Sequence, residues 1–160
     1  NRDLYCFTKG GSSDLKGQCE SGKPQACFAL GSKLIQDGDL DRGIKWEKKG
    51  CDLNGELACT ALIDIYSPID GQRKDPDKFF KYASESCDKG IRNICHTLGL
   101  VILLGHLQNK SWSFLSGEHT AAEFFQKACD PNDDSADGKR RCKDAKERKE
   151  NQYQNIEEEN

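Results

Sequence analysis

The nine cysteines are the residues of this sequence whose type and spacing most directly suggest chemistry. Three pairs have seven residues between their partners, and a fourth pair has twelve. Eight residues along one continuous helix rise about 12 Å, which exceeds the roughly 4.4–6.8 Å that a disulfide allows between α-carbons. Each pair therefore needs a turn between its cysteines. The spacing predicts four disulfides and an oxidising compartment: Cys19–Cys27, Cys51–Cys59, Cys87–Cys95 and Cys129–Cys142.

Metal binding and free thiols are the alternative uses of these cysteines. Zinc sites usually place two cysteines about two to four residues apart, and no such pair occurs here. The histidines His96, His106 and His119 match neither H-E-x-x-H nor H-x₃-H, so we expect no metal and no cofactor. His96 is expected to be a solvated helix residue, with a role on a binding surface as the alternative. Cys6 lies outside the four pairs: it is free, pairs with another chain, or pairs with Cys19 or Cys27 in a different arrangement.

One motif contains the residue types of a nucleophilic enzyme. The segment Ser13-Asp14-Leu15-Lys16 fits S-x-x-K, the nucleophile motif of penicillin-interacting enzymes. The companion motifs S-D-N and K-T-G are absent. We therefore expect Ser13 not to be catalytic and the chain not to be an enzyme, and we retain a β-lactam-binding or β-lactam-hydrolysing enzyme as an alternative function.

The elements that position these residues are predicted to be helices, because a single Val and four Thr argue against much sheet. Gly22, Gly55 and Gly90 lie in the turns between paired cysteines and are expected to end helices with a positive φ. Asp75 is expected to cap the helix that begins at Pro76. The predicted helices are 24–37, 40–51, 56–67, 76–87, 91–106, 118–129 and 138–155.

The first cysteines of successive pairs are 32, 36 and 42 residues apart, a period typical of helix-pair solenoids. The sequence therefore predicts an all-α, right-handed solenoid of antiparallel helix pairs, with about seven helices and disulfides at the turns. Three segments are expected. Residues 1–18 are Gly/Ser-rich and irregular, with room for one short helical turn; residues 19–142 form the solenoid; residues 143–160 form a polar capping helix and tail.

Composition excludes several classes of protein. A net charge of −3 and a pI near 5.7 give no basic footprint for nucleic acid. The longest apolar run, Leu98–Gly105, is too short to span a bilayer, and we predict a buried helix there rather than a buried strand. The chain has no Met and does not begin with a signal peptide. We therefore expect a processed protein of the periplasm or the secreted fraction, with its signal peptide removed.

Several segments resemble the Sel1-like repeat, a relative of the tetratricopeptide repeat. The matching segments are ACFALG at 26–31, ICHTLG at 94–99, FFKYASESCDKG at 79–90 and FFQKACD at 124–130. Cysteines at both ends of each turn are similar to the subgroup typified by the Helicobacter cysteine-rich proteins. The resemblance covers roughly residues 19–145. Two departures are Ile63, where the family prefers Gly, and an insertion between the helices of the third pair.

The resemblance implies a non-enzymatic module that binds a protein partner on the concave face of the solenoid. Two roles fit, a scaffold or an immunity protein that neutralises a secreted bacterial toxin. A redox or metal-handling assembly factor of the mitochondrial intermembrane space is an alternative, because one such factor has a similar cysteine-rich composition. The helical period assigns to the concave face Gln25, Ala29, Ser32, Gln36, Leu57, Ala61, Asp64, Asn93, Thr97, Leu100 and Leu104. Trp112 and Phe114, in the insertion, are predicted to contribute to the partner contact, with packing back on the solenoid as the alternative.

Overall fold

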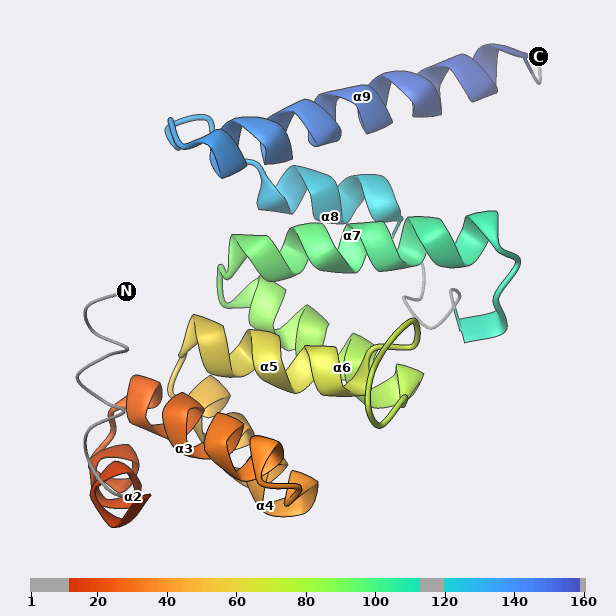
Figure 1. The fold of residues 1–160 in the computed structure, drawn as a ribbon. Helices are drawn as coiled ribbons and strands as arrows, with labels where there is room; N and C mark the ends of the chain where they lie inside the picture. Colours follow the sequence, from red (N-terminus) through yellow and green to blue (C-terminus); the bar gives the residue numbers. More distant parts are fainter. Residues whose placement is uncertain (1–11, 113–119, 159–160) are drawn as a thin grey trace. The chain divides into compact units, whose positions relative to one another are not determined.

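A computed structural model describes residues 12–112 and 120–158 of the chain, and this part is all-helical with no strand. Each of the seven predicted helices is present within about one turn of its predicted ends, which confirms the all-α prediction. Figure 1 shows the helices in chain order. They are α2 (Ser12–Glu20), α3 (Pro24–Gln36), α4 (Leu40–Asp52), α5 (Glu56–Tyr66), α6 (Pro76–Asp88), α7 (Arg92–Leu107), α8 (Ala121–Ala128) and α9 (Ala136–Glu158).

Helix α2 corrects the prediction that residues 1–18 are irregular. It spans nine residues, fewer than an isolated helix needs in water. Leu15 and Cys19 lie four positions apart on one face of α2 and are both buried. The composition of this segment does not predict a helix. The helix is stabilised by the packing of this face and by the disulfide to α3. Residues 1–11, which include Cys6, lie outside the described residues.

The four predicted disulfides are all present. Their Cα–Cα distances are 4.7, 4.4, 4.8 and 4.4 Å, in the order of the chain. Each of the first three bonds joins the end of one helix to the start of the next across a short turn, as the spacing required. Four such bonds indicate an oxidising environment.

The chain divides into two compact units, which we call the N-terminal unit (Asn1–Tyr82) and the C-terminal unit (Ala83–Asn160). The boundary falls within α6, so the segment 19–142 that was expected to be one solenoid contributes to both units. Each unit contains two of the disulfides.

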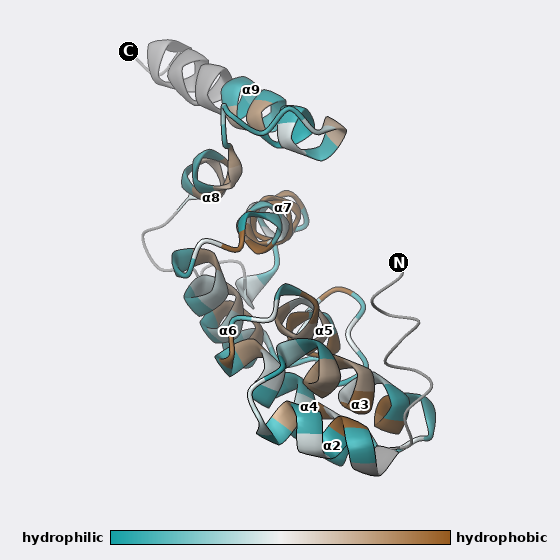
Figure 2. Ribbon diagram, turned by 90° about the vertical axis from the view of Figure 1, so that its left-hand side faces the viewer, coloured by the Kyte–Doolittle hydropathy of each residue, from teal (hydrophilic) through white to brown (hydrophobic). Residues whose placement is uncertain are grey.

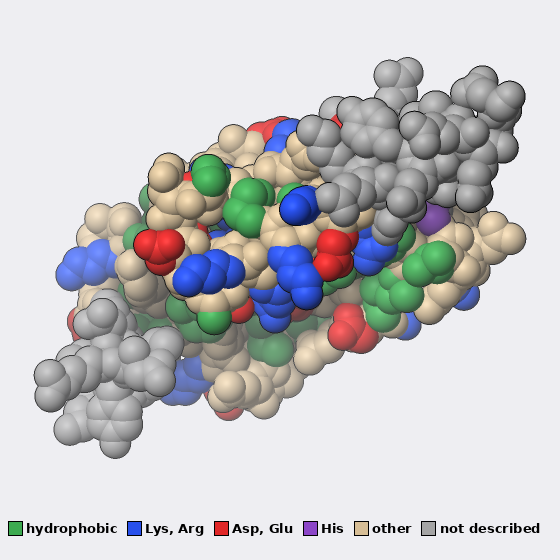
Figure 3. Space-filling view, turned by 90° about the horizontal axis from the view of Figure 1, so that it is seen from above, with side chains coloured by type: hydrophobic (Ala, Val, Ile, Leu, Met, Phe, Trp, Pro, Cys, Tyr) green, Lys and Arg blue, Asp and Glu red, His purple; other side chains and the backbone are tan. Residues whose placement is uncertain are grey.

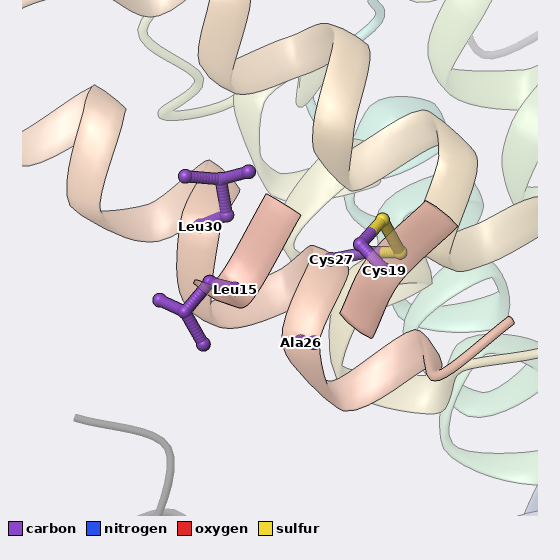
Figure 4. Close-up of a cluster of buried hydrophobic side chains, with 5 residues drawn as sticks. All are labelled: Leu15, Cys19, Ala26, Cys27 and Leu30. Atoms are coloured by element: carbon purple, nitrogen blue, oxygen red, sulfur yellow. A yellow bond between two sulfur atoms is a disulfide. The ribbon is translucent and has the colours of Figure 1, made fainter. Parts of the chain in front are cut away.

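In the N-terminal unit, α3 packs against α2, α4 and α5. Figure 4 shows the buried cluster where α2 meets α3, with the Cys19–Cys27 disulfide joining the two helices. The helix starts follow local rules: Pro24 opens α3, and the Asp39 side chain accepts a hydrogen bond from the Arg42 backbone N–H at the start of α4. Asp75 caps α6 as predicted, because its Oδ1 accepts from the Lys78 backbone N–H at 3.1 Å.

In the C-terminal unit, α8 packs against both α7 and α9 (Figure 1). In Figure 2, α7 is more hydrophobic than the coloured part of α9, in agreement with a buried helix at Leu98–Gly105 and a polar helix near the C-terminal end. Figure 3 shows basic and acidic side chains interspersed over the outer face of α9. Within the described residues, no helix combines the length and hydropathy that crossing a bilayer requires.

Candidate functional site

A groove of about 150 Å³ lies between the first turns of α3 and α5 in the N-terminal unit. Two residues that the helical period assigned to the partner-binding face, Gln25 and Leu57, line it. Both are exposed, and the Leu57 side chain is 47% accessible to solvent. The groove is lined by Pro24, Gln25, Phe28, Gly55, Glu56, Leu57 and Ala58.

The turn before α5 explains why these two helix starts approach each other. A Cβ on Gly55 would lie only 2.7 Å from the Pro24 Cβ, so the close approach requires glycine at this position. The prediction that Gly55 has a positive φ is wrong, because its φ is −74° and the preceding Asn54 takes the left-handed conformation at +62°. Gly22 and Gly90 do have positive φ, at +98° and +92°.

The chemistry of the groove suits recognition of a peptide side chain. Its walls are apolar at Pro24, Phe28 and Leu57, and Gln25 adds an amide that both donates and accepts hydrogen bonds. The lining residues include no nucleophile paired with a base. An apolar hollow with one or two polar groups is the common form of a small binding site.

The other predicted residues of the N-terminal unit lie outside this groove. Ala29 packs against the buried α2–α3 cluster. Ser32 donates a hydrogen bond to Glu47 Oε1 at 3.0 Å, so its hydroxyl faces α4. Gln36 is exposed and Ala61 half-buried. Asp64 lines a separate hollow beside Asp70, and burial, with the charge of Asp70 second, raises the pKa of Asp64 above its ordinary value.

In the C-terminal unit, the predicted residues on α7 divide into two groups. Asn93 accepts a hydrogen bond from Arg141 at 2.6 Å, and Thr97 donates to the Asn93 carbonyl, so these side chains form internal contacts. Leu100 is 44% exposed and Leu104 is half-buried. Leu107, one residue beyond the predicted helix 91–106, belongs to α7 and is 75% exposed, so it extends the same apolar stripe by one turn.

The insertion after α7 is described only in part. Trp112 is half-buried and has an interaction partner. Phe114 and His119 lie outside the described residues, and the role predicted for Trp112 and Phe114 stays a prediction. Ser13 lies in the first turn of α2.

The prediction that His96 is solvated is wrong. Its side chain is buried beneath α9, with Nε2 2.6 Å from Asp144 Oδ2 and its ring 5.4 Å from that of Phe125. Asp144 lies 48 positions after His96 in the sequence, so helical periodicity could not indicate this contact.

Sequence reasoning missed two buried charged residues, Glu47 and Arg141. Glu47 lies four residues before Cys51, just as Ala83 and Phe125 lie four residues before Cys87 and Cys129. A carboxyl at a position where the other two helices have apolar side chains was the signal that could have found it. Arg141 donates to Ala128 O, Asn93 Oδ1 and Asp133 Oδ2, three acceptors that no local pattern connects.

The carboxyl of Glu47 is held between α3 and α4. A Cβ on Gly31 would lie 2.7 Å from Glu47 Oε1, so the glycine provides the space that the carboxyl occupies. Oε2 is buried without a hydrogen-bond partner among the described residues. Loss of hydration on burial raises the pKa of Glu47 to about 8, and the Ser32 hydroxyl opposes this only in part.

No group of three or more His, Cys, Asp or Glu placed to hold a metal occurs in the described part of the chain. The chain matches no family model, no curated protein and no solved structure.

Proposed function

We propose that this chain is a non-enzymatic protein-interaction module of the periplasm or the extracellular space. Its helix pairs stack into a right-handed α-solenoid of the Sel1-like type. The first helices of the pairs, α3, α5 and α7, bind a protein partner, and the module acts as a scaffold or as an immunity protein against a secreted toxin.

The observation that carries this proposal is the groove between α3 and α5. Gln25 and Leu57 are 32 residues apart in sequence, and both line one hollow with Phe28. Large apolar side chains exposed beside a hollow are more typical of a contact surface than of a solvated helix face. A partner that inserts a side chain here would bury Leu57 and Phe28 together.

The apolar stripe on α7 is a second, independent observation in favour of a protein partner. Leu100, Leu104 and Leu107 succeed one another at spacings of four and three residues, which places them on one face of the helix. Two of the three are strongly exposed. Burying each fully would contribute roughly 1.5–3 kcal/mol.

Affinity purification from the native source, with Leu57→Glu as the test variant, checks the proposal. We expect the wild-type chain to retain a specific protein, and the variant to bind that purified protein at least ~tenfold more weakly, because the charge must be desolvated in an apolar groove. Quantitative mass spectrometry identifies the retained protein, and calorimetry measures the two affinities.

Leu53→Glu is the matched control, since Leu53 is 37% exposed and lies outside the groove. It introduces the same charge and should leave the affinity unchanged. Equal affinity of the wild type and the Leu57→Glu variant for every retained protein would contradict the role of the groove.

A further inference from the structure

A second hollow, of about 380 Å³, lies between α2 and α4 in the N-terminal unit. It shares no lining residue with the groove between α3 and α5. We call it the lysine–tryptophan groove. Its lining residues are Lys16, Glu20, Lys45, Trp46, Lys48, Lys49 and Asp52.

The charge of this groove is opposite in sign to that of the chain. Four lysines and two carboxylates line it, whereas the whole chain has a net charge of −3. Lys48 pairs with Asp52 at 2.9 Å. Lys16, Lys45 and Lys49 are exposed, and no carboxylate of the described residues forms a salt bridge with them. The groove therefore presents at least three ammonium groups that can attract an anionic ligand.

Trp46 gives the groove a fixed apolar floor. The indole is half-buried and packs against the α2–α3 cluster of Figure 4, so the core of the N-terminal unit holds it in place. Lys49 Nζ lies 5.7 Å from the centroid of the ring, within reach of a cation–π interaction. Preorganised tryptophans that remain partly exposed are frequent hot spots of protein interfaces.

We propose that the lysine–tryptophan groove binds an acidic polypeptide segment of a partner protein. Side-chain carboxylates of the segment pair with Lys16, Lys45 and Lys49, and an apolar side chain of the segment lies on the indole of Trp46. This site is additional to the groove between α3 and α5 and involves different helices.

The lining favours carboxylates over the phosphates of a nucleic acid. It contains no arginine, the residue whose planar fork recognises phosphate. Glu20 and Asp52 can accept hydrogen bonds from the backbone N–H groups of a polypeptide, and a nucleic-acid backbone has no such donors. A lysine is a point charge that suits single carboxylates arriving from different side chains.

Calorimetric titration of the intact, oxidised chain with a blocked hexapeptide, Glu-Glu-Leu-Glu-Asp-Glu, tests the proposal. We expect saturable binding at low salt that weakens as salt is raised, because exposed charges are screened. The double variant Lys45→Glu/Lys49→Glu should weaken binding at least ~tenfold. The double variant Lys33→Glu/Lys81→Glu, which changes two exposed lysines elsewhere in the same unit, is the matched control and should bind like the wild type.

A second variant separates the indole from the charges. Trp46→Leu should weaken binding of the leucine-containing hexapeptide and leave binding of hexaglutamate unchanged. The fluorescence of Trp46, observed in a Trp112→Phe background, should shift on binding. Circular dichroism of each variant confirms that the helices are retained.

Three results would overturn the proposal. The first is the absence of saturable binding of the hexapeptide at low salt. The second is equal binding of the hexapeptide by the Lys45→Glu/Lys49→Glu variant and by its control. The third is lysine-dependent binding of a thymidine hexanucleotide that is as tight as binding of the hexapeptide. The Leu57→Glu variant should still bind the hexapeptide, so failure of the α3–α5 groove and failure of this site are distinguishable.

Discussion

Glu47 shows how one side chain can make the stability of a unit depend on pH. Its carboxyl is fully buried, Ser32 satisfies only one of its oxygens, and Gly31 leaves it just enough space. A neutral carboxyl is tolerated there far better than a carboxylate. The folded chain therefore keeps Glu47 protonated at pH values where the unfolded chain ionises it.

The resulting prediction is that the folded state loses stability as pH rises. The Glu47 pKa rises from 4.5 in the unfolded chain to about 8 in the folded chain. The stabilisation is therefore fully present below pH 4.5 and is lost as pH rises to about 8. The slope in this interval is ~1.4 kcal/mol per pH unit. Glu47→Gln keeps an acceptor for Ser32 and cannot ionise, so it should remove this slope.

Urea unfolding of the wild type and Glu47→Gln, measured over this interval, provides the check. The difference between their unfolding free energies isolates Glu47 from the other titrating groups. If the unfolding free energies of the two proteins changed in parallel with pH, the folded chain would accommodate the Glu47 carboxylate without a loss of stability.

Helix α9 shows how an element with little apolar surface can be held in place. Its sequence is dominated by Lys, Arg, Glu and Asp, and among its side chains up to residue 148 the buried apolar one is Ala145. Arg141 compensates, because it is buried and donates to acceptors on α7, at the end of α8 and in the loop before α9. Asp144 adds the contact to His96 on α7.

We predict that Arg141→Met destabilises the C-terminal unit by about 2–4 kcal/mol, because it removes charge-assisted hydrogen bonds and leaves the carbonyl of the buried Ala128 without this donor. Arg140→Ala is the matched control. The Arg140 side chain is exposed and forms an ion pair with Asp137 at 3.2 Å. Such an exposed pair contributes roughly 0–1 kcal/mol to stability. Urea unfolding measures both variants, and equal losses would mean that the buried contacts of Arg141 do not hold α9.

At the scale of the whole molecule, the disulfides substitute for apolar core. The chain has one Val and no Met, and only 35% of its residues are hydrophobic. Each disulfide links positions 8 or 13 residues apart, which stabilises by roughly 2–3 kcal/mol in the chain-entropy model. Four such bonds approach the ~5–15 kcal/mol that separates a typical folded domain from its unfolded state.

We therefore predict that reduction unfolds both units near room temperature. The far-UV circular dichroism of the reduced and alkylated chain should lose its cooperative thermal transition, while alkylation without reduction should leave the transition unchanged. A reduced chain that melts within a few degrees of the oxidised one would show that the apolar core suffices. Peptide mapping of the oxidised chain should recover the four pairs.

The sequence by itself determined the helices and the disulfides, because both depend on short-range spacing. Cysteines separated by seven residues can pair only across a turn, and Pro24 and Asp75 mark helix starts through their own backbone chemistry. The exposure of Leu57 and Leu100 likewise followed from the helical period. These features involve residues within a few turns of one another, where geometry is nearly fixed.

Only the tertiary structure decided which polar residues contact other helices. Ser32, Asn93 and His96 lie at positions that the helical period left open to solvent or a partner, yet each contacts a residue 15 or 48 positions away. The helix at Ser12–Glu20 and the lysine–tryptophan groove also depend on packing between different helices. The physical reason is that one helix specifies its own periodicity, whereas burial and charge at its surface depend on the helices that pack against it.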